Sequence, residues 1–344
     1  MTTTGSSAPT PTLIPDGRPD AGAVWHYGDP LGEQRSLVTG AGVVDRSARD
    51  VLVVPGEDRL AWLHSICSQH LSALADGDST EALVLSPHGH VEQHWQVTEL
   101  GGQVWLDTEP GTGAESLAYL VKMRFLKRVE PADLSADWAV LSLVGPATAG
   151  VLERVGYPVP QAPGSASPLD GGGFVRGMPW PGPQAADLLV PRPALPEVLA
   201  ALRDAGAEPA GLWAFEALRV EARRPRLSFE TDHRTIPHEV GWIGSAVHLD
   251  KGCYRGQETV ARVQNLGRPP RRLVLLHLSG EADELPEPGS DVRLGERTVG
   301  FVGTAVHHHE LGPVALAVVK RQLPPGAALS VAGQPVAIDE APVG

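Results

Sequence analysis

The sequence predicts an α+β body followed by a C-terminal β domain, and three observations support this fold class. The runs "DVLVV" (50–54) and "WAVLSLVGP" (138–146) are typical of buried strands. "ALPEVLAALRDAG" (194–206) and "GLWAFEALRVEARR" (211–224) have the apolar spacing of helices. After residue 270 the pattern changes to short apolar runs separated by Gly and Pro, which indicates a small β barrel or sandwich.

Three regions are expected along the 344 residues, because a chain of this length exceeds what one hydrophobic core usually supports. Residues 1–22 are rich in Thr, Ser, Pro and Gly and predict a disordered tail. Residues 23–270 are expected to form the α+β body, as two interleaved subdomains, and residues 271–344 the β domain. Within the body, residues 157–184 are dense in Pro and Gly and predict a long surface loop.

The first half of the body is expected to alternate strands and helices. A turn at Pro55-Gly56 follows the first strand, and three strands are expected next, at residues 81–85, 91–97 and 103–107. A helix is expected over residues 114–129. Between the turn and the second strand, apolar residues recur at helical spacing: Leu60, Leu63, Ile66, Cys67, Leu71 and Leu74.

The composition indicates where in the cell the protein is found and which classes of partner are not expected. No apolar run approaches the ~18 residues that a membrane helix needs, so no membrane partner is expected. The N-terminus has no secretory signal, and two cysteines are typical of a reducing compartment, so we expect a cytoplasmic protein. The net charge of −13 argues against broad nucleic-acid binding.

One basic segment departs from this acidic average and predicts a site for a small polyanion or a short stretch of RNA. The alternative is that its cations are solvated or paired with acids. Residues 251–272 carry six cations against the single acid Glu258: Lys251, Arg255, Arg262, Arg268, Arg271 and Arg272.

Cys253 is the leading candidate for chemistry. It precedes an expected helix ("GQETVARV") and lies between Lys251 and Arg255, and both features favour a thiolate. Gly252 and Gly256 would allow a ligand close to the backbone. The alternative is a small buried hydrophobic side chain, which is what most free cysteines are.

Other clusters are weaker candidates. No intramolecular metal site is expected, because Cys67 falls on the apolar face of its helix and consecutive histidines at 307–309 point to opposite faces of a strand. Arg219, Glu221 and Glu239 could recognise an amidine-like edge of a heterocycle, although surface pairing is the simpler interpretation.

"KGCYRGQE" (251–258) resembles the K-G-C-Y-x-G-Q-E signature of the YgfZ family of folate-binding proteins, relatives of the aminomethyltransferase (T-protein) of the glycine cleavage system. Roughly residues 24–340 are covered by the resemblance. Further segments that are similar to the family are "GVVDRSARDVLVVPGEDRLAWLHSI", "KMRFLKRVEPADLSADWAVLSLVGP", "ALRVEARRP", "TIPHEVGW" and "LGPVALAVVKR".

The resemblance implies a T-protein-like ring of α+β subdomains with antiparallel sheets around a central channel, plus a C-terminal β-barrel. It implies tetrahydrofolate as cofactor, with Glu221 as first candidate for the pterin ring, Glu239 as second, and Arg219 and Trp242 beside them. Lys251, Tyr254 and Gln257 would lie close to Cys253. The function implied is support of iron–sulfur cluster assembly or repair, with iron–sulfur client proteins as partners and tRNA modification as a linked process.

Two departures from the relatives bear on activity. Gln93 and His94 stand where the T-protein has an aspartate pair, and Glu92 would face away from Gln93, which argues against aminomethyl transfer. Arg223 replaces a usual glycine and is expected to reshape the pocket. Two alternatives stay open: a folate-dependent one-carbon (C1) transferase or demethylase that uses Glu92, His94 or Cys253, and an RNA-contacting module built on residues 251–272.

Overall fold

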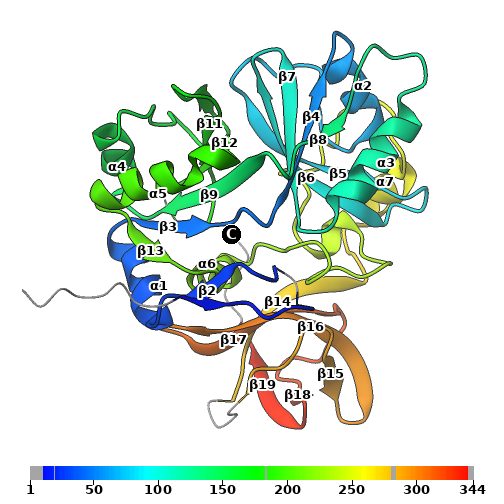
Figure 1. The fold of residues 1–344 in the computed structure, drawn as a ribbon. Coiled ribbons are helices and arrows are strands. Elements are labelled where there is room, and N and C mark those ends of the chain that lie inside the picture. Colours follow the sequence, from blue (N-terminus) through cyan, green and yellow to red (C-terminus); the bar gives the residue numbers. More distant parts are fainter. Residues whose placement is uncertain (1–10, 19, 183, 280–283, 340–344) are drawn as a thin grey trace, which may run out of the picture.

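The computed structural model describes residues 11–18, 20–182, 184–279 and 284–339. Among them, three β bodies are arranged around helix α6 (Leu212–Glu221), as Figure 1 shows. The bodies are a five-stranded sheet, a six-stranded sheet and a closed barrel. The mixed α+β content with a C-terminal β-barrel confirms the predicted fold class.

The five-stranded lobe has the strand order β5-β6-β7-β4-β8. Its core joins Trp62 and Leu63 of one helix to Trp95 and Leu120. The predicted strands are confirmed, with these bounds for the lobe: β4 (Asp50–Pro55), α2 (Arg59–Ile66), β5 (Ser79–Leu85), β6 (Val91–Leu100), β7 (Gln103–Thr108), α3 (Gly113–Met123) and β8 (Ala132–Asp133).

Both helices of this lobe end earlier than the apolar spacing predicted. Cys67 is extended, with φ −124° and ψ 173°, and the chain then turns to pair Ser68 N–H with the carbonyl of Leu83. Phe125 takes a left-handed conformation (φ +46°), which ends α3. Apolar spacing alone missed the end of α2 because Leu71 is buried in the same core without being helical.

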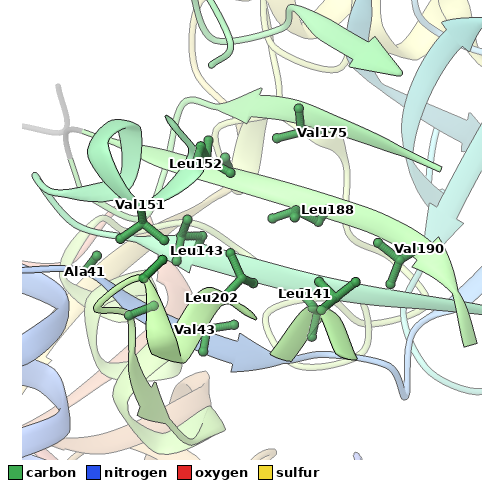
Figure 2. Packing of buried hydrophobic residues seen from close by; sticks show 14 of the residues in the cluster. Ala41, Val43, Leu141, Leu143, Val151, Leu152, Val175, Leu188, Val190 and Leu202 are labelled. Atoms are coloured by element: carbon green, nitrogen blue, oxygen red, sulfur yellow. The ribbon is translucent and has the colours of Figure 1, made fainter. Parts of the chain in front are cut away.

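The six-stranded lobe has the order β10-β11-β12-β9-β3-β13, with only β13 parallel to its neighbour β3. Two helices cover one face, and Leu152 and Leu202 pack there on Leu141, Leu143 and Leu188 (Figure 2). The lobe's elements are β3 (Gly42–Asp45), β9 (Trp138–Val144), α4 (Thr148–Arg154), β10 (Ala166–Pro168), β11 (Phe174–Met178), β12 (Ala185–Pro191), α5 (Leu195–Asp204) and β13 (Glu208–Ala210).

The prediction of a surface loop over residues 157–184 was wrong. This segment contributes β10 and β11, and Phe174 and Val175 are fully buried. The glycines that suggested a loop make the tight turn between these strands. At Gly173, φ is +89° and a β-carbon would lie 2.0 Å from the carbonyl oxygen of Leu189, so only glycine fits.

The N-terminal residues lie against the central helix. β1 (Thr12–Leu13) pairs with β2 (Val24–His26), and Trp25 packs in the core of α6 with Phe215. Residues 1–10 and 19 of the expected tail lie outside the described residues. Helix α1 (Pro30–Thr39) follows and contacts both α6 and β13.

The barrel closes in the order β14-β17-β16-β15-β18-β19 around a core that includes Val274, Val302 and Val319. Its strands are β14 (Arg271–His277), β15 (Asp291–Leu294), β16 (Arg297–His308), β17 (Gly312–Lys320), β18 (Leu329–Val331) and β19 (Gln334–Ile338). No helix in the described part of the chain is long and apolar enough to cross a membrane.

Replacing Phe174 tests its placement in a core. We expect Phe174→Ala to lower the free energy of unfolding by about 3–5 kcal/mol, because it leaves a cavity at a fully buried aromatic position. Phe125→Ala, at a position 81% exposed, is the matched control and should cost less than about 0.5 kcal/mol. Urea unfolding checks both variants, and equal effects would contradict the buried placement.

Candidate functional site

The segment between α6 and the barrel carries most of the residues singled out in the sequence. It contains the short 3₁₀ turn η2 (Pro237–Glu239) and helix α7 (Gln257–Leu266). Trp242 and Tyr254 of this segment share a hydrophobic core with Leu83 and Val91 of the five-stranded lobe. The segment therefore lies directly on the β5–β6 hairpin.

Lys251 is a structural cation and does not face Cys253 as predicted. Its Nζ donates hydrogen bonds to the backbone carbonyls of His64, Cys67 (2.6 Å) and Gln69 (3.0 Å). These carbonyls end helix α2 and begin the following turn, where a cation is favoured. Burial lowers the pKa of Lys251, and its ammonium is committed to α2. The sequence placed Lys251 beside Cys253 because the two residues are close in the chain. The carbonyls that Lys251 binds lie more than 180 residues earlier, so the sequence could not indicate them.

Cys253 is exposed, on a loop that the rest of the protein holds in place. We call residues 248–256 the cysteine loop. Helix α7 begins at Gln257, so the thiol lies ahead of the helix, as the sequence predicted.

Two contacts lock the far end of the cysteine loop. Arg255 pairs with Glu92 at 2.9 Å, so neither group is a free charge. Gly256 has φ +82°, and a β-carbon there would lie 2.6 Å from the carbonyl oxygen of Ser86. Glycine is thus required for the loop to approach the β5–β6 turn.

Tyr254 and Gln257 support the loop from the inside. Tyr254 is buried, burial raises its pKa to about 12, and its ring lies 5.0 Å from the Lys251 ammonium. The backbone N–H of Gln257 donates to the Tyr254 carbonyl at 3.3 Å. Lys251 and Tyr254 thus lie in one loop with Cys253, and Gln257 follows as the first residue of α7. Lys251 and Tyr254 are buried, whereas Cys253 is exposed.

Glu239 is already occupied by an internal partner. Its carboxylate accepts hydrogen bonds from Arg271 Nε (2.8 Å), Arg271 Nη2 (2.7 Å) and the Ile236 N–H (3.1 Å). Arg271 also pairs with Asp232 at 2.7 Å. Glu239 therefore ties the segment to the first barrel strand, in place of the ring contact expected from the sequence.

Arg219 and Glu221, two residues apart on α6, lie in different surroundings. Arg219 is fully buried and bonds Glu216 (2.7 Å), Glu230 (3.2 Å) and Thr304, so it joins the helix to the barrel.

The side chain of Glu221 is half exposed and lies 3.3 Å from His308 Nε2. Because Nδ1 of His308 accepts two backbone N–H bonds, its proton is on Nε2 and is donated to Glu221. This hydrogen bond holds the pKa of Glu221 below its usual value. Glu221 alone among these acids keeps an accessible carboxylate.

The structure assembles a cluster that the sequence did not indicate, the His94 cluster, consisting of Glu81, His94, Arg224 and Trp242. His94 Nε2 lies 3.3 Å from Glu81, and the ring of Trp242 packs on the imidazole with centroids 4.8 Å apart. Arg224 pairs with Glu81 and also lies over the ring of Trp180 at 5.5 Å. Four separate chain segments meet here, so no spacing in the sequence could have found it.

The His94 cluster combines a fixed charge with unpaired donors. Burial alone would raise the pKa of Glu81, but the His94 hydrogen bond and the Arg224 charge lower it to about 2, so the carboxylate stays ionised. The indole N–H groups of Trp180 and Trp242 are buried without an acceptor among the described residues. A buried donor without a partner is costly, so an acceptor on a ligand or water would stabilise this region.

A second cluster of buried charges holds the lobes together, and we call it the ionic cluster. Arg226 pairs with Asp20 (2.9 Å), Glu109 and Glu216, and Arg49 pairs with Glu109 (2.9 Å) and Asp107 (2.8 Å). Burial would raise the pKa of Glu109, but Arg226 and Arg49 keep it well below its usual range. A small cavity beside Arg46 and Arg49 has room for about one water molecule.

The remaining predictions concern metals and cations. No group of three or more His, Cys, Asp or Glu within the described ranges is arranged to hold a metal ion. Of the six basic residues in 251–272, Lys251, Arg255 and Arg271 have partners, whereas Arg262 and Arg268 are exposed and Arg272 is partly exposed. Three of the six cations that the sequence predicted to be available for an anion are therefore already paired.

Replacing Lys251 tests its structural role. We expect Lys251→Met to destabilise the protein by roughly 2 kcal/mol or more, because it leaves buried carbonyls without a donor. Trypsin should then cleave after Arg255 faster than in the wild type. Lys122→Met, at an exposed lysine, is the control. If both variants lose the same stability and are cleaved at the same rate, the hydrogen bonds from Lys251 to the end of α2 do not hold the cysteine loop in place.

Comparison with known proteins finds distant similarity to aminomethyltransferases. Residues 27–160 match the GCVT N-terminal domain. The chain is 26% identical over 320 residues to an aminomethyltransferase of Nostoc sp. (89% of this chain, 82% of the relative) and 27% identical over 295 residues to one of Symbiobacterium thermophilum (81% and 78%).

A solved structure shows the same fold over nearly the whole chain. The glycine cleavage system aminomethyltransferase T from Bartonella henselae superposes with a TM-score of 0.83 at 19% identity, covering 94% of this chain and 92% of that one. The chain therefore contains a GCVT N-terminal domain, has the fold of an aminomethyltransferase and is a distant relative of those enzymes.

Proposed function

We propose that this protein binds tetrahydrofolate beside the His94 cluster and supports the assembly or repair of iron–sulfur proteins through Cys253. The observation that carries the proposal is the exposed thiol on a locked loop, packed on the same β5–β6 hairpin that holds His94. Two cysteines without a disulfide support work in the reducing cytoplasm.

The residues of the His94 cluster fit a folate headgroup. Trp242 and its neighbour Trp180 carry buried indole N–H groups that lack acceptors among the described residues, and Glu81 is a fixed anion for ring N–H donors. Glu221, with its accessible carboxylate, is a further contact of the headgroup. Relatives named aminomethyltransferase support a ligand of this class. Bound there, a reduced folate would supply a carrier for one-carbon groups.

The exposed cations give the protein a second point of contact with partners. Arg262, Arg268 and Arg272 lie between α7 and the first barrel strand, and none of them has an acid partner among the described residues. They fit the phosphates of a short RNA segment such as part of a tRNA, within a chain that otherwise repels nucleic acid. This surface is separate from the thiol's contact with an iron–sulfur client.

Folate-dependent C1 transfer is the second candidate, and the Glu81–His94 pair favours it. If His94 donates its Nε2 proton to the ionised Glu81, Nδ1 is left as a base, which is what proton removal from an amine substrate needs. Glu92, a candidate replacement for the lost aspartate, is paired with Arg255. Gln93, at one of the aspartate positions, accepts a hydrogen bond from Ser116 (3.0 Å) on α3.

Calorimetric titration with tetrahydrofolate in reducing buffer tests the proposed function. We expect micromolar binding by the wild type and by Cys253→Ser, because the thiol is outside the folate contacts. In cells, Cys253→Ser should lower the activity of iron–sulfur enzymes several-fold, and Ser65→Ala is the matched control on the neighbouring surface. Absence of folate binding, or full client activity in Cys253→Ser, contradicts the respective half of the proposal.

Turnover of a methylamine substrate with tetrahydrofolate tests the second candidate. We expect His94→Asn and Glu81→Gln each to reduce the rate on the order of 100-fold or more if the pair moves a proton. His90→Asn, on the turn before β6, is the control and should keep the wild-type rate. A wild type without turnover on a panel of N-methyl amines rules out this activity while leaving folate binding intact.

A further inference from the structure

The turn after α3 presents an apolar tip to solvent. We call residues 121–128 ("VKMRFLKR") the basic knob. Leu126 is 99% exposed, Phe125 81% and Val121 54%. An adjacent pair of apolar side chains exposed to this degree on a folded surface marks a place where something else binds.

The basic knob is held in a fixed shape. The indole N–H of Trp62 donates to the Met123 carbonyl at 2.9 Å, and the Arg128 N–H donates to Asp58 at 2.8 Å. A β-carbon at Gly56 would lie 2.1 Å from the carbonyl oxygen of Arg128, so the base of the knob is closely packed. The side chains of Phe125 and Leu126 are therefore presented by a rigid turn, which lowers the entropic cost of binding.

The charge of the basic knob is opposite to that of the chain. Lys122, Arg124 and Lys127 are exposed and have no ion pair with any described residue, while Arg128 pairs with Glu57. The chain as a whole carries −13. Opposite charges on the two surfaces steer association toward this one place.

The open end of the barrel carries a recess of complementary character. Its volume is about 300 Å³, the lower end of the range for binding pockets. Apolar side chains form most of its wall, and Glu284 lies at it as an acid, whereas Glu287 is paired with Arg18. The apolar residues are Leu278, Leu285, Pro286, Pro313, Val331 and Val336.

We propose that the basic knob of one molecule docks in the barrel recess of a second copy. Figure 1 places the end of α3 beside the five-stranded sheet and β18 and β19 at the far end of the barrel, so one molecule cannot make the contact with itself. The apolar tip meets an apolar recess, and lysine and arginine meet glutamate. The contact is head-to-tail, which closes into a ring or extends as a chain.

The size of the contact sets its strength. A knob of eight residues buries less than the roughly 800 Å² per partner of a standard stable interface. The association is therefore reversible and concentration-dependent. Its ionic part weakens as salt is raised, because exposed charges are screened.

Sedimentation velocity of the full chain over a range of concentrations tests the proposal. The weight-average mass of the wild type rises above that of the monomer as concentration increases. Leu126→Asp removes the knob, Leu285→Arg fills the recess, and each variant alone stays monomeric. Leu266→Asp, on an α7 side chain that is 73% exposed and outside both surfaces, is the matched control and associates like the wild type.

Mixing the two defective variants gives the decisive result. The Leu126→Asp chain keeps its recess and the Leu285→Arg chain keeps its knob, so together they form a one-to-one complex and nothing larger. Circular dichroism and thermal melting establish that both variants are folded. Lys127→Glu combined with Glu284→Lys restores association that each change alone weakens.

Three results overturn the proposal. One is a wild type that stays monomeric at all concentrations. Another is association that neither variant affects, or that mixing the variants fails to restore, because a symmetric interface behaves in that way. The third is a monomer whose knob binds vesicles of phosphatidylglycerol and phosphatidylcholine or a single-stranded RNA oligonucleotide, since the occupant is then not a second copy.

Discussion

The buried pairing of Arg226 with Glu109 is the interaction on which the arrangement of the lobes depends. It joins the segment after α6 to the end of β7, and Arg226 extends the contact to Glu216 on α6 and Asp20 near the N-terminus. In a low-dielectric interior such charges are tolerated only when every one is paired. Loss of one partner leaves a buried charge, which typically costs about 3–5 kcal/mol. The cluster therefore allows only one relative position of the five-stranded lobe and α6.

That position assembles the His94 cluster. Arg224, two residues before Arg226, reaches Glu81 on β5 only when α6 is held at this distance from the sheet. Glu81 in turn holds His94, and Trp242 covers the imidazole face. The cluster is rigid because it is attached to strands and to the segment after α6, and Glu81 stays ionised through the His94 hydrogen bond and the Arg224 charge.

The cysteine loop is held by contacts of its own, separate from the ionic cluster. Lys251 binds the carbonyl end of α2 and Gly256 packs on the β5–β6 turn, so the polar and steric anchors point inward. The thiol of Cys253 is exposed. A loop of this kind presents a thiol at the surface without a pocket of its own.

Much of the fold could be predicted from the sequence because its signals are local. Apolar alternation located β5, β6 and β7, and helical spacing located α5 and α6. Residues 157–184 misled the prediction, since the same glycines that suggest a loop also make the tight turn between β10 and β11. The prediction used only the Gly and Pro content of the segment. Strand formation there depends on pairing with β12, which contains Leu189 and lies outside the segment.

The sequence by itself determined the α+β order of the chain, its C-terminal β domain and the unusual cysteine segment, because periodicity and motif spacing act between near neighbours. Only the tertiary structure decided which charges are free. Glu239 and Lys251 looked equally available in the sequence, yet Arg271 and three distant carbonyls occupy them. The reason is physical: a buried charge pairs with whatever the fold places within a few ångströms, and those partners lie tens to hundreds of residues away along the chain.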